Sequence, residues 1–344
     1  MPEFSQFAPA VNLGILAVAA IIIGVFGWRL ASTADKLADA TGLGEAIAGA
    51  ILLGAATSLP GIITSAVTAW DGLPQLSVSN AVGGIAAQTA FLAIADITYK
   101  RANLEHAAAS APNILQAALL VTLLSVPLIA TTGPDVTFLG IHPATPILFG
   151  AYIYGMHLVK RAHEIAPWKP QQTKETREDE GDDQPFEGKT SPLWISFGVN
   201  TVIVGIAGFV VARTGTAVAL QTGLSETAVG GFLTAVSTSL PELVTSIAAV
   251  RQGALTLAVA GIIGGNCFDT LFLAVADIAY RPGSIYHHIS DSQSFLMGLT
   301  IFMISVLLMG LIRREKRGIA NIGFESFVIL LVYVGAVVFM FTSE

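Results

Sequence analysis

Long apolar stretches follow one another along almost the whole chain, each bounded by charged or turn-forming residues. A helix of about twenty residues crosses the roughly 30 Å of bilayer hydrocarbon, and ten stretches are about that long or longer. We expect spans near residues 9–28, 43–69, 73–98, 112–130, 143–160, 192–212, 224–250, 255–280, 293–312 and 319–341. The pattern predicts an all-α polytopic membrane protein with ten transmembrane helices. The lipid bilayer is therefore an expected partner of this protein.

Composition supports this class and excludes others. Of the 344 residues, 53% are hydrophobic and 12% are charged, which is roughly half the charged fraction of a soluble globular protein. The net charge of −7 includes a cluster of acids between Glu175 and Glu187, while most basic residues lie beside span ends, so nucleic-acid binding is disfavoured. The single cysteine, Cys267, has no partner for an internal disulfide.

The basic residues predict an orientation. If the N-terminus is outside, 15 of the 17 Lys and Arg residues fall on inner segments, and only Arg213 and Arg281 fall outside. Because inner loops of membrane proteins are enriched in Lys and Arg, both termini are expected outside and residues 161–191 in the cytoplasm. With no targeting segment recognisable, a bacterial or archaeal cytoplasmic membrane is the expected location.

The segment 161–191 differs from its surroundings and divides the chain. Prolines interrupt a charged tract there, which is typical of a flexible linker. Its acidic spacing faintly resembles a calcium loop, but Thr176 occupies the first acidic position, so a solvated linker is the favoured interpretation. We therefore expect a first half at 1–160, a cytoplasmic linker, and a second half at 192–344.

The two halves contain an internal repeat. Residues 41–100 align without a gap onto residues 222–281 at an offset of 181, and 25 of the 60 positions are identical. The shared elements include Thr-Ser-Leu-Pro at 57–60 and 238–241, Gly-Gly at 83–84 and 264–265, and the segments 91–97 and 272–278. Since the copies lie five spans apart, they run in opposite directions through the membrane. Such inverted five-helix repeats are typical of secondary transporters with a substrate site near the bilayer midplane.

The repeated Thr-Ser-Leu-Pro motif should open its helix. Pro60 and Pro241 lack an amide hydrogen, so carbonyl groups one turn earlier, near Ala56 and Ser237, lose their helical partners. The hydroxyls of Thr57, Ser58, Thr238 and Ser239 then lie beside carbonyl oxygens, in the kind of oxygen-rich shell that binds Na⁺ or Ca²⁺. The plainer alternative is that these hydroxyls bond to their own helix or join neighbouring helices.

Two acids are the central candidates. Glu242 follows the second Thr-Ser-Leu-Pro motif, and Asp269 lies near the centre of the eighth expected span. An ionised side chain at the bilayer centre costs on the order of 3 kcal/mol, and no interior Lys or Arg is at hand to neutralise either acid. We expect both to be protonated or bound to a cation. The acids nearer span ends, such as Asp96, Asp277 and Glu325, are expected to reach water or a basic neighbour.

These residues resemble the α-repeats of the sodium/calcium exchangers, within the calcium/cation antiporter superfamily. The resemblance covers most of the chain and is specific in the second repeat, at residues 238–242 and 264–269. It implies that Glu242 holds the central cation, that Asp269 binds or exchanges a flanking ion, and that Thr238 and Ser239 supply oxygens. Thr57 and Ser58 match the family pattern in the first repeat.

The first repeat departs from that pattern. Gly61 stands where the family has a second glutamate, and Gln88 occupies the position that Asp269 has in the second repeat. Gln88 still offers an amide oxygen, whereas Gly61 leaves a space that water or a larger substrate could fill. Because two opposite charges about 4 Å apart interact by roughly 4 kcal/mol at an effective dielectric of 20, the missing carboxylate calls calcium selectivity into question.

The function expected is secondary active antiport by alternating access, moving Ca²⁺ or another cation against Na⁺ or H⁺, with no prosthetic cofactor. Two alternatives stay open. One is a cation-coupled transporter of a substrate other than calcium, and the other is a transport-deficient membrane sensor or assembly subunit. Enzymatic catalysis has little support, since Cys267 is a lone thiol and His287-His288 lies in an outer loop where solvation explains the pair.

Overall fold

The computed structural model describes residues 4–41, 57–98, 103–165, 190–252, 255–315 and 323–342. These segments are almost entirely helical, and their only β-type pairing is an isolated bridge between Phe138 and Ile141. Most of the expected linker, at 166–189, and residues 42–56 of the first repeat lie outside the described residues. An all-α fold is confirmed for the part of the chain that is described.

The described residues of the first half form mainly long helices. Their bounds are α1 Pro9–Thr41, α4 Leu59–Trp70, α5 Pro74–Thr98, α7 Ala111–Thr132 and α8 Ala144–Glu164, with short helices η1 Phe4–Gln6 and α6 Leu104–Ala107. Prolines lie in the first turn of several helices, such as Pro60 in α4, where a missing amide hydrogen costs nothing.

The second half follows the same plan with more interruptions. Its long helices are α9 Ser191–Thr222, α12 Leu240–Gln252, α13 Leu255–Asp269, α15 Asp291–Arg313 and α16 Phe324–Thr342. Its short elements are α10 Glu226–Ala228, the π-helical η3 Val229–Thr234, α11 Ala235–Thr238, α14 Leu271–Ala279 and η4 Ile285–His287.

Seven helices in the described residues are long and apolar enough to cross a membrane. An eighth span is formed if α10 to α12 are taken together, with a bend of 47° between residues 226–238 and 240–251. The described part of α4 is a shorter apolar helix, and α8 is not among the apolar spans. The count of ten therefore stays a prediction, while the polytopic helical architecture is supported.

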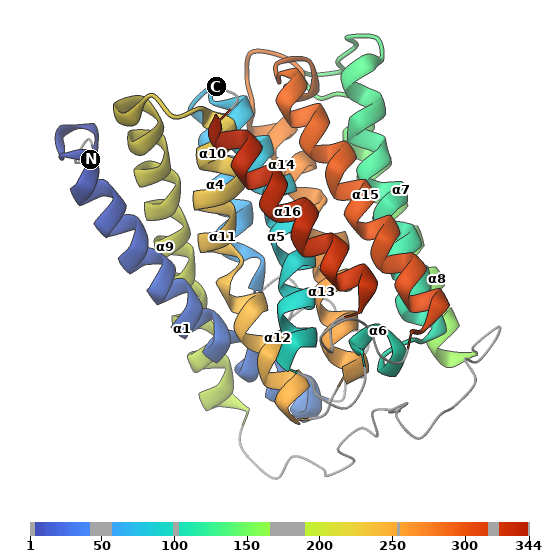
Figure 1. Ribbon diagram of the computed structural model, residues 1–344. Coiled ribbons are helices and arrows are strands. Elements are labelled where there is room, and N and C mark those ends of the chain that lie inside the picture. The colour runs from blue at the N-terminus through green and yellow to red at the C-terminus, as the bar shows by residue number, and fades with distance from the viewer. Residues whose placement is uncertain are drawn as a thin grey trace.

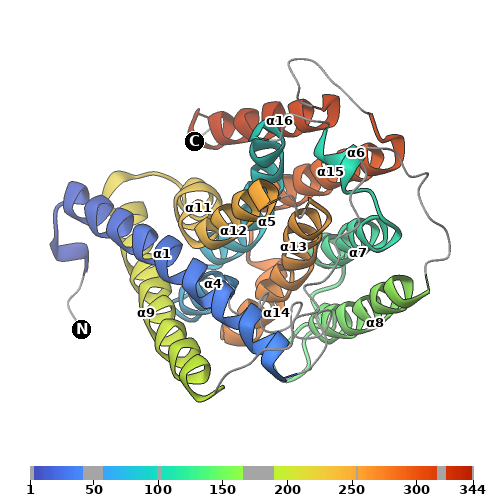
Figure 2. The same cartoon turned by 90° about the horizontal axis from the view of Figure 1, so that it is seen from below.

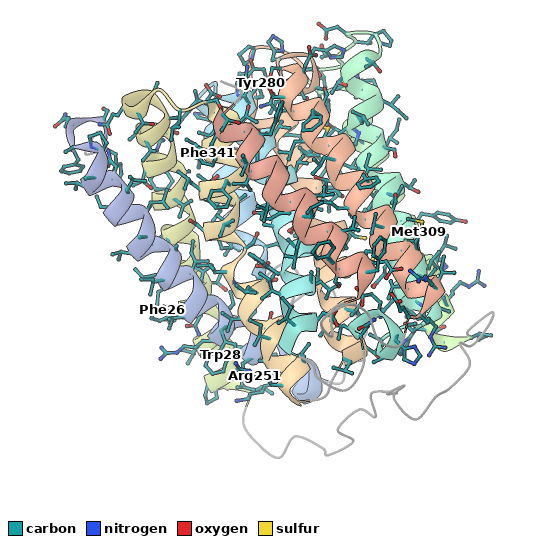
Figure 3. All side chains as sticks on the ribbon, in the orientation of Figure 1. Phe26, Trp28, Arg251, Tyr280, Met309 and Phe341 are labelled. Carbon is teal, nitrogen blue, oxygen red and sulfur yellow. The ribbon has the colours of Figure 1, made fainter. Side chains whose placement is uncertain are left out.

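The helices form one bundle in which α5 lies near the centre, beside α12 and α13 (Figures 1 and 2). The start of α1 and the end of α16 lie at one end of the bundle, and the end of α8 and the start of α9 lie at the other (Figure 1). Exposed apolar side chains, among them Trp28, Met309 and Phe341, project from the outside (Figure 3). An outer surface of this kind is suited to lipid.

Helices α1 and α9 pack against each other through their own apolar contacts and lie across the proline-containing helices of the opposite half. A Cβ atom at Gly27 of α1 would lie 2.4 Å from Cγ of Pro241, and one at Gly208 of α9 would lie 2.8 Å from Cα of Pro60. Gly27 and Gly208 are related by the repeat offset of 181, as are the two prolines. The repeat symmetry therefore extends beyond the aligned segments into these two helices.

Candidate functional site

The second Thr-Ser-Leu-Pro motif interrupts a helix at its serine, and the serine of the first motif immediately precedes one. In the second half α11 ends at Thr238, Ser239 has φ −95° and ψ 7°, and α12 begins at Leu240. In the first half Ser58 precedes the first residue of α4. The expected opening is confirmed in the second half, where its cause is Pro241, two residues after Ser239, and in the first half it stays a prediction, because residues 42–56 lie outside the described residues.

The two candidate acids are inside the bundle. Glu242 lies in the first turn of α12 with 5% of its surface exposed, and Asp269 is the last residue of α13 with 1% exposed. Their carboxyl groups are close enough to interact electrostatically. None of the ion pairs found among the described residues includes either acid. Within the described part of the bundle, the two acids therefore have no fixed cationic partner.

Hydrogen bonds join the acids of the second half to the motif of the first. Ser58 donates its hydroxyl to Oδ1 of Asp269, and Nε2 of Gln88 donates to Oδ2 of Asp269 at 2.6 Å. The same Gln88 nitrogen donates to Oγ of Ser239 at 3.2 Å. Thr57 forms a side-chain hydrogen bond with Glu242. Four of the seven residues expected from the sequence thus form one hydrogen-bond network, and Thr57 and Glu242 form a pair that interacts electrostatically with Asp269.

Thr238 is the seventh, and it follows the plainer interpretation. Its hydroxyl donates to the carbonyl of Ala235 in its own helix at 3.2 Å, although the side chain is buried beside the network. Hydroxyls that bond one turn back satisfy themselves without a partner from another helix. In this conformation Thr238 does not join the two halves.

Several buried oxygens have no hydrogen-bond partner among the described residues. They include Oε2 of Glu242, Oε1 of Gln88 and Oδ1 of Asn266. Buried polar atoms are nearly always paired, so such atoms require an explanation, and carboxylate and amide oxygens are ligands that hard cations prefer. The donor set of this site therefore fits a cation as substrate.

Two asparagines and a phenylalanine belong to the site, although the candidate list from the sequence lacks them. Asn266 donates to Oγ1 of Thr89 at 3.1 Å, and Asn80 donates to the carbonyl of Gly61 at 3.2 Å. The ring of Phe272 lies directly over Gly61. Asn266 follows the repeated Gly-Gly pair and could have been found from that motif, whereas Asn80 corresponds to Gly261 and has no signal in the repeat.

The contact of Phe272 corrects an expectation about Gly61. The glycine does not leave open space, because a Cβ atom there would lie 2.5 Å from Cε2 of Phe272. The missing side chain is compensated by an aromatic ring from α14. Sequence pattern alone did not indicate this, since Phe272 is also part of an apolar motif that repeats in the first half.

The glycine pairs serve close packing in the manner of membrane helix contacts. A Cβ atom at Gly83 would lie 2.4 Å from the carbonyl oxygen of Gly231, so α5 approaches η3 along its backbone. Gly84 faces the hydroxyl of Ser239, and Gly265 faces the amide oxygen of Gln88. The glycines therefore bring polar groups of the two halves together.

Two of the acids near span ends, Asp96 and Asp277, are buried among backbone amides, which contradicts the expectation that they reach water or a basic neighbour, whereas Glu325 does pair with Arg313 at 3.2 Å. Asp96 accepts hydrogen bonds from the amides of Leu104 at 2.6 Å and Gly323 at 3.0 Å. Asp277 accepts from the amides of Ile285 at 3.0 Å and His142 at 2.9 Å. Each aspartate binds the amide eight residues later, so the two are repeat counterparts that fix a chain turn at opposite ends of the bundle. A buried carboxylate is stable there because several donors surround it.

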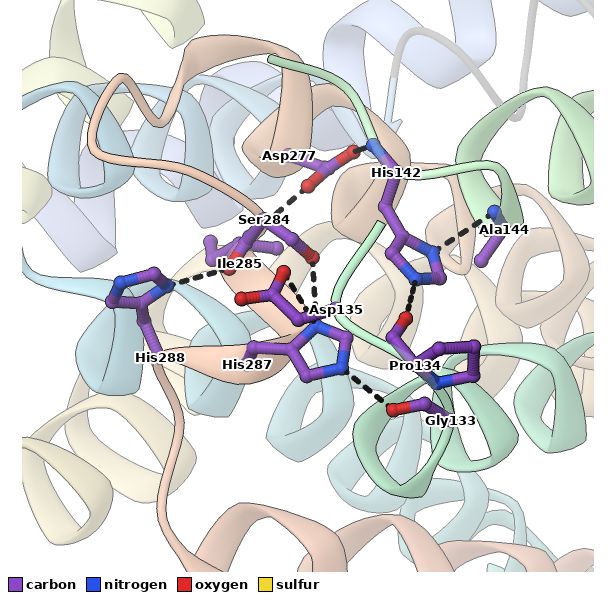
Figure 4. A network of polar contacts seen from close by, with 10 residues as sticks. All are labelled: Gly133, Pro134, Asp135, His142, Ala144, Asp277, Ser284, Ile285, His287 and His288. Carbon is purple, nitrogen blue, oxygen red and sulfur yellow. Dashed lines mark hydrogen bonds and ion pairs between the residues drawn. The ribbon is translucent and has the colours of Figure 1, made fainter. Parts of the chain in front are cut away.

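His287 and His288 take part in a polar network around Asp277 (Figure 4). His287 contacts the carbonyl of Gly133 through Nε2 at 3.0 Å, and Nδ1 of His288 donates to the carbonyl of Ser284 at 2.7 Å. Among the described residues, no group of three or more metal-ligating side chains is found. The histidines therefore connect loops in this structure.

A search of known families matches the chain to the family described as sodium/calcium exchanger protein, over residues 11–154 and 192–342. The inner membrane protein YrbG of Escherichia coli K12 is 27% identical over 86% of this chain and 89% of its own length. The putative antiporter CaxA of Alkalimonas amylolytica is 24% identical over 92% of this chain and 94% of its own. The sodium/calcium exchanger MaX1 of Methanosarcina acetivorans is 32% identical over 35% of this chain and 32% of its own.

Solved structures show the same fold. The structure of native YfkE has a TM-score of 0.62 at 17% identity, covering 95% of this chain and 91% of that protein. A structure of the sodium-calcium exchanger NCX_Mj also gives 0.62 at 17% identity, covering 96% and 99%. With the membrane-spanning helices and the family match over both halves, the chain belongs to the sodium/calcium exchanger family, whose members are membrane cation antiporters and not enzymes.

Proposed function

We propose that this protein exchanges cations across the membrane by alternating access, at a site formed by Glu242, Asp269, Ser58, Gln88 and Ser239, with Thr57 and Thr238 beside them. The observation that supports the proposal is the hydrogen-bond network that joins Asp269 and Ser239 of one half to Ser58 and Gln88 of the other. Any relative movement of the halves must change this network and the access to it. One site can in this way face each side in turn.

Electrostatics gives the network its reason to bind ions. Glu242 and Asp269 repel each other when both are ionised, and both are buried away from water. Protons or transported cations relieve that cost, and replacing one by the other is antiport. We propose Na⁺ or H⁺ as the driving ion and Ca²⁺ or another cation as the counter-substrate, in keeping with the names antiporter and sodium/calcium exchanger carried by relatives.

The alternative functions differ in the ion flux that they would produce across the membrane. A sensor or assembly subunit would give no exchange that depends on an ion gradient, although its carboxylates could still bind cations. A cation-coupled carrier of another solute would let its driving ion through only when that solute is present. The repeat-related site favours the antiporter, because Glu242 and Gln88 in it keep buried oxygens that have no partner among the described residues and that a cation could bind.

Purified protein in proteoliposomes tests this directly. We expect the wild type to exchange cations when a Na⁺ or H⁺ gradient is imposed, and Glu242→Gln or Asp269→Asn to lower the rate at least tenfold because the charge that the substrate balances is gone. Glu164→Gln removes an exposed carboxylate at the end of α8 and is the matched control. Equal rates in Glu242→Gln and wild type would contradict the proposal.

A further inference from the structure

Gly61 lies in the first turn of α4, at the position that Glu242 has in α12. A Cβ atom there would lie 2.5 Å from Cε2 and 3.1 Å from Cζ of Phe272. Real Cβ atoms do not come within 3.0 Å of a ring carbon, so the ring takes the place of any side chain at residue 61. Phe272 is buried in α14 and packs edge to face on Phe268, which leaves it little freedom to turn away.

The repeat shows which contact the ring replaces. The bond from Ser58 to Asp269 and the bond from Gln88 to Ser239 are counterparts under the offset of 181. By the same offset, the counterpart of the contact between Thr57 and Glu242 would join Thr238 to residue 61. That contact cannot form with glycine. Thr238 donates to the carbonyl of Ala235 instead, as described above.

The consequence is an asymmetric distribution of negative charge, because both acids of the site come from the second half. Both oxygens of Asp269 already accept hydrogen bonds, from Ser58 and Gln88, whereas Glu242 keeps one oxygen without a partner among the described residues. Ca²⁺ takes six to eight oxygen ligands and usually several carboxylates. Ring carbons of Phe272 offer none and exclude water from the side where a second carboxylate would stand.

We propose that Phe272, packed onto Gly61, is the specificity-determining residue of this site and restricts it to singly charged cations, namely Na⁺, K⁺ or H⁺. Glu242 supplies the carboxylate oxygen that faces such a charge, because both oxygens of Asp269 accept hydrogen bonds, and the neutral oxygens of Gln88, Ser58 and Asn266 complete the shell. The inference rests on the proposed exchange function and names its substrate class. Gly61 and Phe272 together exclude divalent ions from the site.

The test is a two-residue cycle in proteoliposomes, with Na⁺, K⁺, H⁺ and Ca²⁺ gradients imposed in turn. Its members are the wild type, Gly61→Glu, Phe272→Ala and the double variant Gly61→Glu/Phe272→Ala. We expect the wild type to exchange singly charged cations with Ca²⁺ flux at background. We expect only the double variant to exchange Ca²⁺, at least tenfold above background, because it alone has both the carboxylate and the space for it.

Phe91→Ala is the matched control. Phe91 is the repeat counterpart of Phe272, so this variant removes the same ring from the other half, and combined with Gly61→Glu it should leave Ca²⁺ flux at background. The steric clash at residue 61 can be tested separately. Gly61→Ala should lower the thermal stability, and adding Phe272→Ala to that variant should restore it. Strong Ca²⁺ exchange by the wild type, or equal gains in Gly61→Glu and the double variant, would overturn the inference.

Ca²⁺ binding to the detergent-solubilised protein distinguishes a failure of the proposed exchange function from a failure of the role proposed for Phe272. If the wild type moves no cation under any gradient, the exchange function fails. The inference is then decided by Ca²⁺-dependent thermal stabilisation, which we expect for the double variant and not for either single variant. Stabilisation of the wild type by Ca²⁺ would refute the assigned role of Phe272.

Discussion

Glu105 is a buried acid that is not part of the proposed site. It lies in α6, between the membrane-spanning helices α5 and α7, with its carboxylate bonded to the hydroxyl of Ser326 and its Oε2 unpaired among the described residues. Burial, followed by the negative charge of Asp96, raises the pKa of Glu105 from about 4.5 to about 7. Glu325 adds to the rise, and the hydrogen bond from Ser326 opposes it.

This pKa predicts how stability depends on pH. Between about pH 4.5 and pH 7 the folded protein binds more protons at Glu105 than the unfolded chain does, so this residue's contribution falls as the pH rises through that window and is level above it. The full loss is on the order of 3 kcal/mol. Glu105→Gln imitates the protonated acid, so we expect it to match the wild type in thermal unfolding at pH 4.5 and to be more stable at pH 8.

The control for Glu105 is Glu164→Gln, which changes an exposed carboxylate and should shift the unfolding temperature little at either pH. A difference between Glu105→Gln and wild type that stays constant from pH 4.5 to pH 8 would show that the carboxyl group does not titrate in this window.

At the residue scale, the sequence predicted the members of the site better than their contacts. Thr57, Ser58, Ser239 and Gln88 could be found because polar residues that keep register inside apolar repeats stand out. Phe272 could not, since an apolar residue within an apolar helix carries no sign of what it covers. Asp96 and Asp277 were misjudged for a related reason: a residue's distance from a span end says nothing about the amides that fold back over it.

At the element scale, the proline motifs predicted where helices open, but nothing in the apolar pattern predicted which helices lie over the openings. Periodicity reports that a helix is long enough to span, and neighbours are decided by packing. The crossing of α1 over Pro241 and of α9 over Pro60 depends on glycine at the two contact points. These contacts couple each helix to a break that carries site residues.

The glycine contacts give a prediction about α1 and α9. Gly27→Ala and Gly208→Ala place a methyl group 2.4 Å from Pro241 and 2.8 Å from Pro60, so we expect each to displace the break and to lower the exchange rate per folded protein severalfold. Gly14→Ala and Gly198→Ala are controls on the same two helices, because nothing lies within 4 Å of their added atoms. Alanine improves helix propensity, so the controls should be neutral or stabilising. Equal exchange rates in Gly27→Ala and Gly14→Ala would show that the contact of α1 with Pro241 does not affect transport.

At the scale of the whole molecule, hydropathy and the internal repeat were sufficient for the helical membrane class. The described helices form seven or eight apolar spans, because α4 is described only from Leu59 and α8 is less apolar than the others. The arrangement of chain ends is independent of that count. The start of α1 and the end of α16 share one end of the bundle, as an even number of crossings requires (Figure 1).

The orientation of the bundle in the membrane follows from charge and can be measured. With Lys and Arg gathered on inner segments, we expect the start of α1 outside and the end of α8 inside, at opposite ends of the bundle (Figure 1). Gln6 and Glu164 are exposed at these two places, so each tolerates a cysteine. In intact cells a membrane-impermeant maleimide should label Gln6→Cys, and Glu164→Cys should react only after the cells are permeabilised. The native thiol, Cys267, is fully buried and sets the background. The reverse labelling pattern would place the linker outside and would mean that the basic residues do not determine the insertion of this chain.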